Sequence, residues 1–242
     1  MSEEFDRKVV IPGEELGEGI ASYNAYEEGG KVFSRVVGLS EKRGNAFLVI
    51  PLSGVYNPKK GDGVIGKISE VSFSKWVVDI NSPYQSVLPL NEAVEEFVDL
   101  TKTDLTKFFN YGDMVFAEIT SVSKNKNIQL SMHDRKCRKL REGRLIKVVP
   151  AKVPRIIGKN GSMVEMIKKL TGTQIVVGQN GIVWIKGENE VVATEAILTV
   201  ERMSQSHGLT DYIKNMLEDK LGVKSEDIIQ EGEKYGEERD AL

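Results

Sequence analysis

Short apolar, β-prone runs separated by polar and glycine-containing turns dominate the first half of the chain, and they predict β-strands. In residues 1–58, two such runs lie at residues 31–37 and 46–50. They are bounded by the Gly-Gly pair at residues 29–30 and the Gly-Asn pair at residues 44–45, which are turn signals. Tight turns between short strands predict a small N-terminal β module without helices.

Residues 59–133 show more strands of the same kind and are predicted to form a second domain. We expect its strands at residues 64–71, 76–80, 86–90, 114–122 and 128–131. Residues 92–109, between the third and fourth strands, have mixed helical spacing. Five strands with a helical insertion at that place are typical of an OB-type barrel.

The third region alternates between strand and helix. Strands are expected at residues 145–149, 174–177 and 182–186, and helices at residues 153–157, 162–170 and 190–203. The order β-α-α-β-β-α predicts an α/β domain, which we place at residues 134–207 together with a basic linker at its start. Residues 208–242 are expected to form one helix, at 209–221, and then an acidic, disordered tail. The predicted fold class is therefore multidomain, mainly β with a C-terminal α/β domain.

The composition excludes several classes of protein. The apolar fraction is 40% and the charged fraction 29%, as in ordinary globular proteins. No apolar run approaches the roughly 18 residues of a membrane span, and the N-terminus has no signal-peptide pattern, so a cytoplasmic protein without a membrane partner is expected. One cysteine and two histidines cannot build a disulfide or a closed zinc site. We therefore expect neither a metal nor a cofactor.

The net charge of −3 hides an uneven distribution. Residues 134–159 carry ten Lys and Arg against two acids, whereas residues 218–242 carry nine acids against four bases. Charges are screened over about 8 Å at physiological ionic strength, so the local sign matters more than the sum. The middle of the chain is therefore a candidate surface for a polyanion.

The strongest motif is a turn in which Gly158 and Gly161 flank Lys159 and Asn160, between the short helix and the next one. Glycines allow a tight turn and the close approach of another backbone. The free amides at the start of the second helix and the Lys159 ammonium would attract a phosphodiester. We add Arg155 as a neighbouring cation, and expect bases to contact an adjacent groove formed by these apolar residues: Ile156, Ile157, Val164, Ile175 and Val176.

This glycine-flanked turn, within this order of elements, resembles the KH domain of the eukaryotic (type I) topology. The resemblance implies that the turn clamps a short stretch of single-stranded nucleic acid. A helix-turn-helix without a ligand is the alternative.

Residues 61–68 and 111–131 resemble the RNA-binding barrel first known from ribosomal protein S-one. The resemblance implies that Trp76 stacks on bases, with Phe73 and Tyr84 as neighbours. Phosphates would meet the lysines of the same surface: Lys75, Lys124 and Lys126. A core role is the alternative for Trp76 and Phe73, and residues 84–90 lack the histidine that many relatives carry.

The basic run between the two modules is the last candidate site. Arg135, Lys136 and Arg138 are expected to contact phosphates, which would make binding sensitive to salt. The alternative is a solvated linker.

The sequence has no Ser/His/Asp set, no HExxH motif and no P-loop, so an enzyme is not expected. The order of β module, barrel and single KH domain resembles the RNA-binding cap subunit of the archaeal exosome, of the KH-bearing type. That resemblance implies a non-catalytic protein that docks on a hexameric ring of phosphorolytic nuclease subunits, three copies per ring. It would capture single-stranded RNA and thread it for 3′-to-5′ degradation. A transcription or translation factor with the same modules, or a nuclease acting alone, are the alternatives.

Overall fold

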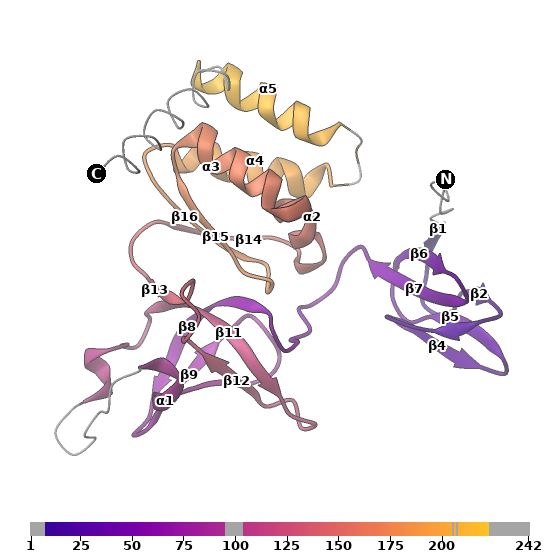
Figure 1. Cartoon of the computed structure of the whole chain (residues 1–242), viewed down its shortest axis with the longest axis horizontal. Helices are drawn as coiled ribbons and strands as arrows, with labels where there is room; N and C mark the ends of the chain where they lie inside the picture. The colour runs from indigo at the N-terminus through magenta and orange to yellow at the C-terminus, as the bar shows by residue number, and fades with distance from the viewer. Residues whose placement is uncertain (1–7, 95–103, 205, 207, 223–242) are drawn as a thin grey trace, which may run out of the picture. The chain divides into compact units, whose positions relative to one another are not determined.

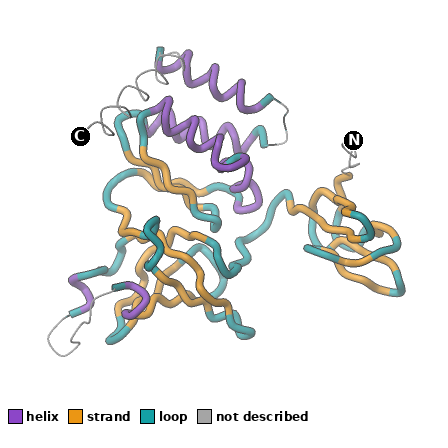
Figure 2. Tube along the Cα trace, viewed as in Figure 1, coloured by secondary structure: helices purple, strands orange, loops and turns teal. Residues whose placement is uncertain are grey.

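The computed structural model describes residues 8–94, 104–204, 206 and 208–222. The chain forms two compact units, Met1–Val55 with Val149–Lys152 and Tyr56–Val148 with Val153–Leu242. Strands and turns account for residues 8–55, while the longer helices all belong to the second unit (Figure 2).

Two small sheets build the N-terminal module, with strand orders β1-β6-β7-β3 and β2-β5-β4. The strands are β1 (Lys8–Val10), β2 (Glu15–Gly17), β3 (Ile20–Ala21), β4 (Ala25–Glu28), β5 (Lys31–Ser34), β6 (Gly38–Arg43) and β7 (Ala46–Pro51). A small core of Ala25, Val32 and Phe47 holds them together. The predicted strands at residues 31–37 and 46–50 are β5 and β7. Most of the others are too short for an alternating pattern to be visible in the sequence.

The second unit begins with the predicted barrel. Its strands are β8 (Gly63–Val71), β9 (Lys75–Asp79), β10 (Ser86–Pro89), β11 (Met114–Val122) and β12 (Ile128–Ser131). They pair in the order β12-β10-β9-β8-β11, and β12 also pairs with β11, which closes the barrel. The five predicted strands and the OB-type closure are thus confirmed. Between β10 and β11 lie the short helix α1 (Leu90–Ala93) and the 3-10 turn η1 (Leu105–Lys107), while the rest of the predicted helical insertion, residues 95–103, lies outside the described residues.

The predicted linker contains a strand that the sequence did not indicate. β13 (Arg138–Leu140) adds to the barrel sheet and pairs antiparallel with β11. Leu140 is buried, whereas Arg138 is exposed. A basic sequence can occupy this position because an edge strand tolerates charged side chains that face the solvent.

The α/β domain has the predicted order of elements. They are β14 (Arg144–Lys147), α2 (Val153–Ile157), α3 (Ser162–Thr171), β15 (Gln174–Val177), β16 (Ile182–Lys186) and α4 (Glu190–Arg202). The sheet order is β14-β16-β15. Figure 1 shows α3 and α4 beside this sheet and α5 (Leu209–Leu221), the predicted extra helix, on their far side. Apolar residues of α5 complete the core, namely Leu209, Ile213 and Leu217, while the predicted disordered tail lies beyond the described residues.

The barrel and the α/β domain share a tightly packed junction at the turn between β15 and β16. The side chain of Asn180 in this turn is 0% exposed and hydrogen-bonds the main chain of the barrel. The amide of Gln179 also donates to the carbonyl of Gly63, at 2.8 Å. An apolar cluster contributed by both modules, with Ile65 and Trp184 among its buried members, surrounds these contacts. The two modules therefore form one body.

Candidate nucleic-acid interface

The turn between α2 and α3 depends on its two glycines for different reasons. Gly158 has a φ of 77°, and a Cβ there would lie 2.7 Å from the amide nitrogen of Met163, so no larger residue fits. Gly161 has a φ of 84°, but a Cβ there would meet no atom within 4 Å. Asn160 also takes a left-handed conformation, with a φ of 53°. The first glycine thus packs against α3, and the second borders open space.

Lys159 and Asn160 form the exposed tip of this turn. The Lys159 side chain makes no hydrogen bond or ion pair within the described chain. Two amides of the turn already have acceptors, because the Gly161 N–H donates to the carbonyl of Gly158 at 3.3 Å and the Ser162 N–H donates to the carbonyl of Lys159. The dipole of α3 adds positive potential at the same place. The prediction of an exposed ammonium at this helix end therefore matches the geometry, whereas the amides of Gly161 and Ser162 are not free as predicted. Arg155 is also exposed, and its guanidinium donates to the carbonyl of Ser206 at 3.2 Å.

The predicted apolar groove beside the turn is mostly wrong. Ile156, Val164 and Ile175 are buried in the core of the domain and have no surface to offer a base. Ile157 and Val176 are half-buried and keep part of their side chains exposed. The sequence shows that these residues are apolar, but helical spacing does not distinguish a groove from a core.

The prediction that Trp76 stacks on RNA is also wrong, because its side chain is 0% exposed. The indole N–H donates to the carbonyl of Phe109 at 2.9 Å. The two rings meet edge to face, with centroids 5.3 Å apart and an interplanar angle of 85°. The segment that follows η1 thus covers this face of β9, and Trp76 belongs to the barrel core.

Other predicted residues of the barrel are accessible. Phe73, in the turn between β8 and β9, is 74% exposed. Tyr84 is 36% exposed, and the ammonium of Lys126 lies 5.6 Å from the centre of its ring. Lys75 and Lys124 are exposed as well. The structure therefore brings Tyr84 and Lys126 together as one aromatic and cationic surface.

The basic run is divided between internal contacts and the solvent. Lys139 forms an ion pair with Asp113, and the guanidinium of Arg138 lies 5.9 Å from the centre of the Trp184 ring. Arg135 and Lys136 are exposed, and their side chains make no ion pair with a described residue. Of the three phosphate contacts predicted in this run, Arg135 and Lys136 are the more available, because the guanidinium of Arg138 lies beside Trp184.

Lys147 is a basic residue that the sequence did not single out as an RNA contact. It lies on β14, and its ammonium donates to the side-chain oxygen of Asn81 in the loop after β9, at 3.4 Å. Tyr84 follows in the same loop. Lys147 becomes a candidate because it is exposed at the end of a strand that lies next to the barrel. Only the tertiary structure shows this position.

Two ionisable groups near the junction have displaced pKa values. Burial raises the pKa of the Cys137 thiol to about 11, so it stays protonated and unreactive at neutral pH. Burial opposes ionisation of Asp113, but hydrogen bonds from Lys139 and from the Asn110 amide lower its pKa below the ordinary value. Both groups are structural.

The described residues hold no group of three or more His, Cys, Asp or Glu side chains that could bind a metal ion. None of the described helices is long and apolar enough to cross a bilayer.

Known families match the chain along most of its length. The model of the exosome RNA binding protein RRP4 N-terminal domain matches residues 7–53, that of the RRP4 S1 domain residues 55–121, and that of the KH domain residues 143–191. The exosome complex component Rrp4 of Thermococcus kodakarensis is 46% identical, over 96% of this chain and 95% of its own length. The chain belongs to the Rrp4 family. Rrp4 of Pyrococcus furiosus is 45% identical, over 93% of this chain and 89% of its own.

A solved structure agrees with this assignment. A crystal structure described as an exosome complex RNA-binding protein matches with a TM-score of 0.62 and 30% identity, over 69% of this chain and 97% of that one. The resemblance to the KH-bearing exosome subunit of archaea is thereby confirmed, as are the S1-type barrel and the KH domain. In this Rrp4-family chain, the turn at residues 158–161 is accordingly the glycine-flanked loop of a KH domain.

Proposed function

We propose that this chain is a non-catalytic RNA-binding component of an exosome and that its KH turn holds the backbone of single-stranded RNA. The observation that carries the proposal is the exposed pair Lys159 and Asn160 on a turn in which Gly161 borders open space. A phosphate there meets the positive end of the α3 dipole and an unpaired ammonium. The match of residues 143–191 to the KH domain supports the proposal, because KH domains clamp about four nucleotides.

The barrel adds a second, weaker contact. Tyr84 and Phe73 present aromatic faces on which bases stack without regard to sequence. Lys126, Lys75 and Lys124 offer phosphate contacts beside them. Because the barrel and the KH domain form one body, an RNA that reaches both sites gains from a high effective concentration at the second.

The N-terminal module would attach the chain to its partner. Several large apolar side chains on it are well exposed, namely Val9, Ile11, Ile20 and Val37. Exposed apolar surface of this kind supports a protein interface. We propose that three copies dock through it on a hexameric ring of phosphorolytic nuclease subunits in the cytoplasm. The copies would then deliver RNA to the ring for 3′-to-5′ degradation while cutting nothing themselves.

Assembly and catalysis can be tested together. The chain is mixed with the ring subunits of the same organism, and the mass of the complex is measured by light scattering. Ile20→Asp should abolish co-assembly, whereas Val191→Asp, which places the same charge on the exposed face of α4, should not. Labelled RNA incubated with the chain alone, phosphate and Mg²⁺ should stay intact. Turnover by the chain alone, or co-elution with RNA polymerase or ribosomes in place of the ring, would contradict the proposal.

A further inference from the structure

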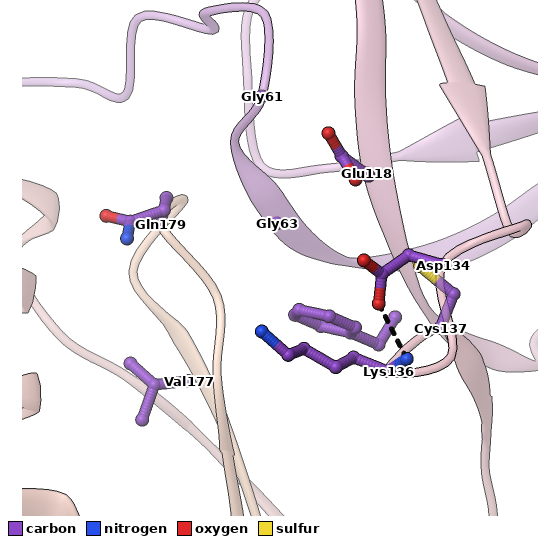
Figure 3. Close-up of a pocket in the computed structure, with 9 residues that line it drawn as sticks. Gly61, Gly63, Glu118, Asp134, Lys136, Cys137, Val177 and Gln179 are labelled. Atoms are coloured by element: carbon purple, nitrogen blue, oxygen red, sulfur yellow. Dashed lines mark hydrogen bonds between the residues drawn. The ribbon is translucent and has the colours of Figure 1, made fainter. Parts of the chain in front are cut away.

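A cavity of about 240 Å³ lies where the barrel, the segment after it and the KH domain meet. The barrel contributes Phe116 and Glu118, the connecting segment Asp134 and Lys136, and the KH hairpin Gln179 (Figure 3). Since a water molecule takes about 30 Å³ in the liquid, the cavity has room for a planar nucleobase. It opens between the two modules to which RNA binding is assigned above.

Several polar side chains line this cavity and form no hydrogen bond or ion pair with one another. The side chains of Glu118, Lys136 and Gln179 make no hydrogen bond or ion pair within the described chain. One carboxylate oxygen of Asp134 accepts from the amide of Lys136 at 2.7 Å, and its other oxygen is left over. Figure 3 shows the Lys136 ammonium reaching toward the hairpin of Val177 and Gln179, with both carboxylates on the barrel side. Two carboxylates thus lie on one wall and the Gln179 carboxamide, which can donate and accept, on the other, while the Lys136 ammonium extends from the carboxylate side toward the hairpin.

The main chain of the walls is held in place before any ligand arrives. The main chain of Gln179 is fixed by the bond from its N–H to the carbonyl of Gly63, and the side chain of its neighbour Asn180 hydrogen-bonds the barrel. A Cβ on Gly63 would lie 2.6 Å from the ring of Phe116, so glycine is needed for that ring to form part of the wall. Because the main chain is already in place, only side chains such as those of Glu118, Lys136 and Gln179 have to be ordered when a ligand binds.

The charges decide which part of an RNA chain can enter. Two carboxylates repel a phosphate, but they accept hydrogen bonds from the exocyclic amine of adenine, guanine or cytosine. Uracil has no such amine. Lys136 and the Gln179 amide can donate to ring nitrogens or carbonyls on the opposite edge of the same base.

We propose that the junction cavity binds one unstacked base of single-stranded RNA and selects a base that carries an exocyclic amine, with Glu118 as its acceptor. This inference rests on the proposed RNA-binding function. It adds selectivity to a protein whose other contacts are to phosphates and to the faces of bases.

The test compares oligoribonucleotides that differ by one amine. Each probe is a ten-nucleotide oligouridylate with one different nucleoside at its centre. In the first pair this nucleoside is adenosine or purine riboside, which lacks only the amine of adenosine. In the second pair it is guanosine or inosine, which lacks only the amine of guanosine. Affinities are measured by fluorescence anisotropy. The amine should tighten binding by about fivefold or more, the lower end of what one good base contact contributes. Equal affinities within both pairs would overturn the inference.

A variant then locates the effect. Glu118→Met keeps the approximate length of the side chain but removes both acceptor oxygens, so it should bring the affinity ratio within each pair close to one. Glu70→Met, an exposed change that removes the same charge on β8 of the same barrel, should leave the ratio as it is. A ratio that survives Glu118→Met would remove the cavity from the interpretation. If the unaltered chain bound none of the oligonucleotides, the proposed function itself would fail, which is a distinct result.

Discussion

The side-chain amide of Asn180 pairs with both main-chain groups of Ile65, accepting from its N–H at 3.3 Å and donating to its carbonyl at 2.7 Å. A second donor bond reaches the carbonyl of Ile80 at 2.8 Å. Asn180 lies in the KH hairpin and Ile65 on strand β8 of the barrel, 115 residues apart. One module therefore completes the hydrogen bonds of the other, and this fixes the spacing between their RNA-binding surfaces.

Removing this side chain should cost the second unit much of its stability. Asn180→Ala leaves the N–H and C=O of Ile65 and the carbonyl of Ile80 buried without partners, and the expected loss is on the order of 3 kcal/mol in the free energy of unfolding. Urea denaturation measures it. The control, Asn125→Ala in the exposed turn before β12, should change stability little. Equal effects of the two substitutions would contradict the role assigned to Asn180.

Trp76 should matter for stability and not directly for RNA. Trp76→Ala removes a fully buried ring and its bond to Phe109, so a loss of about 3–5 kcal/mol is expected. Thermal unfolding should show a large fall in Tm. If the substituted chain melted normally and bound RNA more weakly, the indole would have to reach the surface after all.

The exposed aromatic residues should behave in the opposite way. Phe73→Ala and Tyr84→Ala should each weaken binding of single-stranded RNA by about 1–3 kcal/mol, because each removes one stacking face, while Tm stays unchanged. Tyr212→Ala, at a half-exposed tyrosine on α5, is the matched control and should bind as before. If both barrel variants bound RNA as tightly as the control, the barrel surface would be excluded as a binding site.

Acid should loosen the attachment of β13 to the barrel. The pKa of Asp113 is lower in the folded chain than in the unfolded one, so the pair with Lys139 stabilises the fold above the unfolded pKa of about 4. That stabilisation is lost as the pH falls through the lower, folded pKa. Asp113→Asn should therefore lower the free energy of unfolding at pH 7 and flatten its decline between about pH 5 and pH 2. Denaturant titrations at these pH values check it, and parallel curves for the two proteins would contradict it.

Local signals in the sequence were enough for most of the fold. A short run rich in aromatic and β-branched residues revealed β9, where Trp76 and Val78 point inward, and helical spacing revealed α3 and α4. The KH turn was visible because the need for glycine is a local property of the backbone. The left-handed conformations of Gly158 and Gly161 can therefore be inferred from the local sequence alone.

Contacts between distant segments could not be predicted in the same way. Trp76 is buried by Phe109, 33 residues later, and a periodic pattern does not show which loop covers a strand. Asn180 lies in a hairpin turn, where asparagine is common, and its partners belong to another module, so the local sequence does not reveal them. The junction cavity likewise depends on three segments whose side chains meet only after the barrel and the KH domain have packed together.

The central claim is that the KH turn holds the RNA backbone, and one pair of double variants tests it most directly. Lys159→Asp with Asn160→Asp places negative charge on the turn, and Lys214→Asp with Asn215→Asp makes the same change to the same dipeptide on α5. The affinity for a single-stranded RNA is measured by anisotropy at several salt concentrations. The turn variant should bind at least about tenfold more weakly than the control, with a salt slope reduced by about one. Equal affinities and slopes for the two variants would contradict the claim.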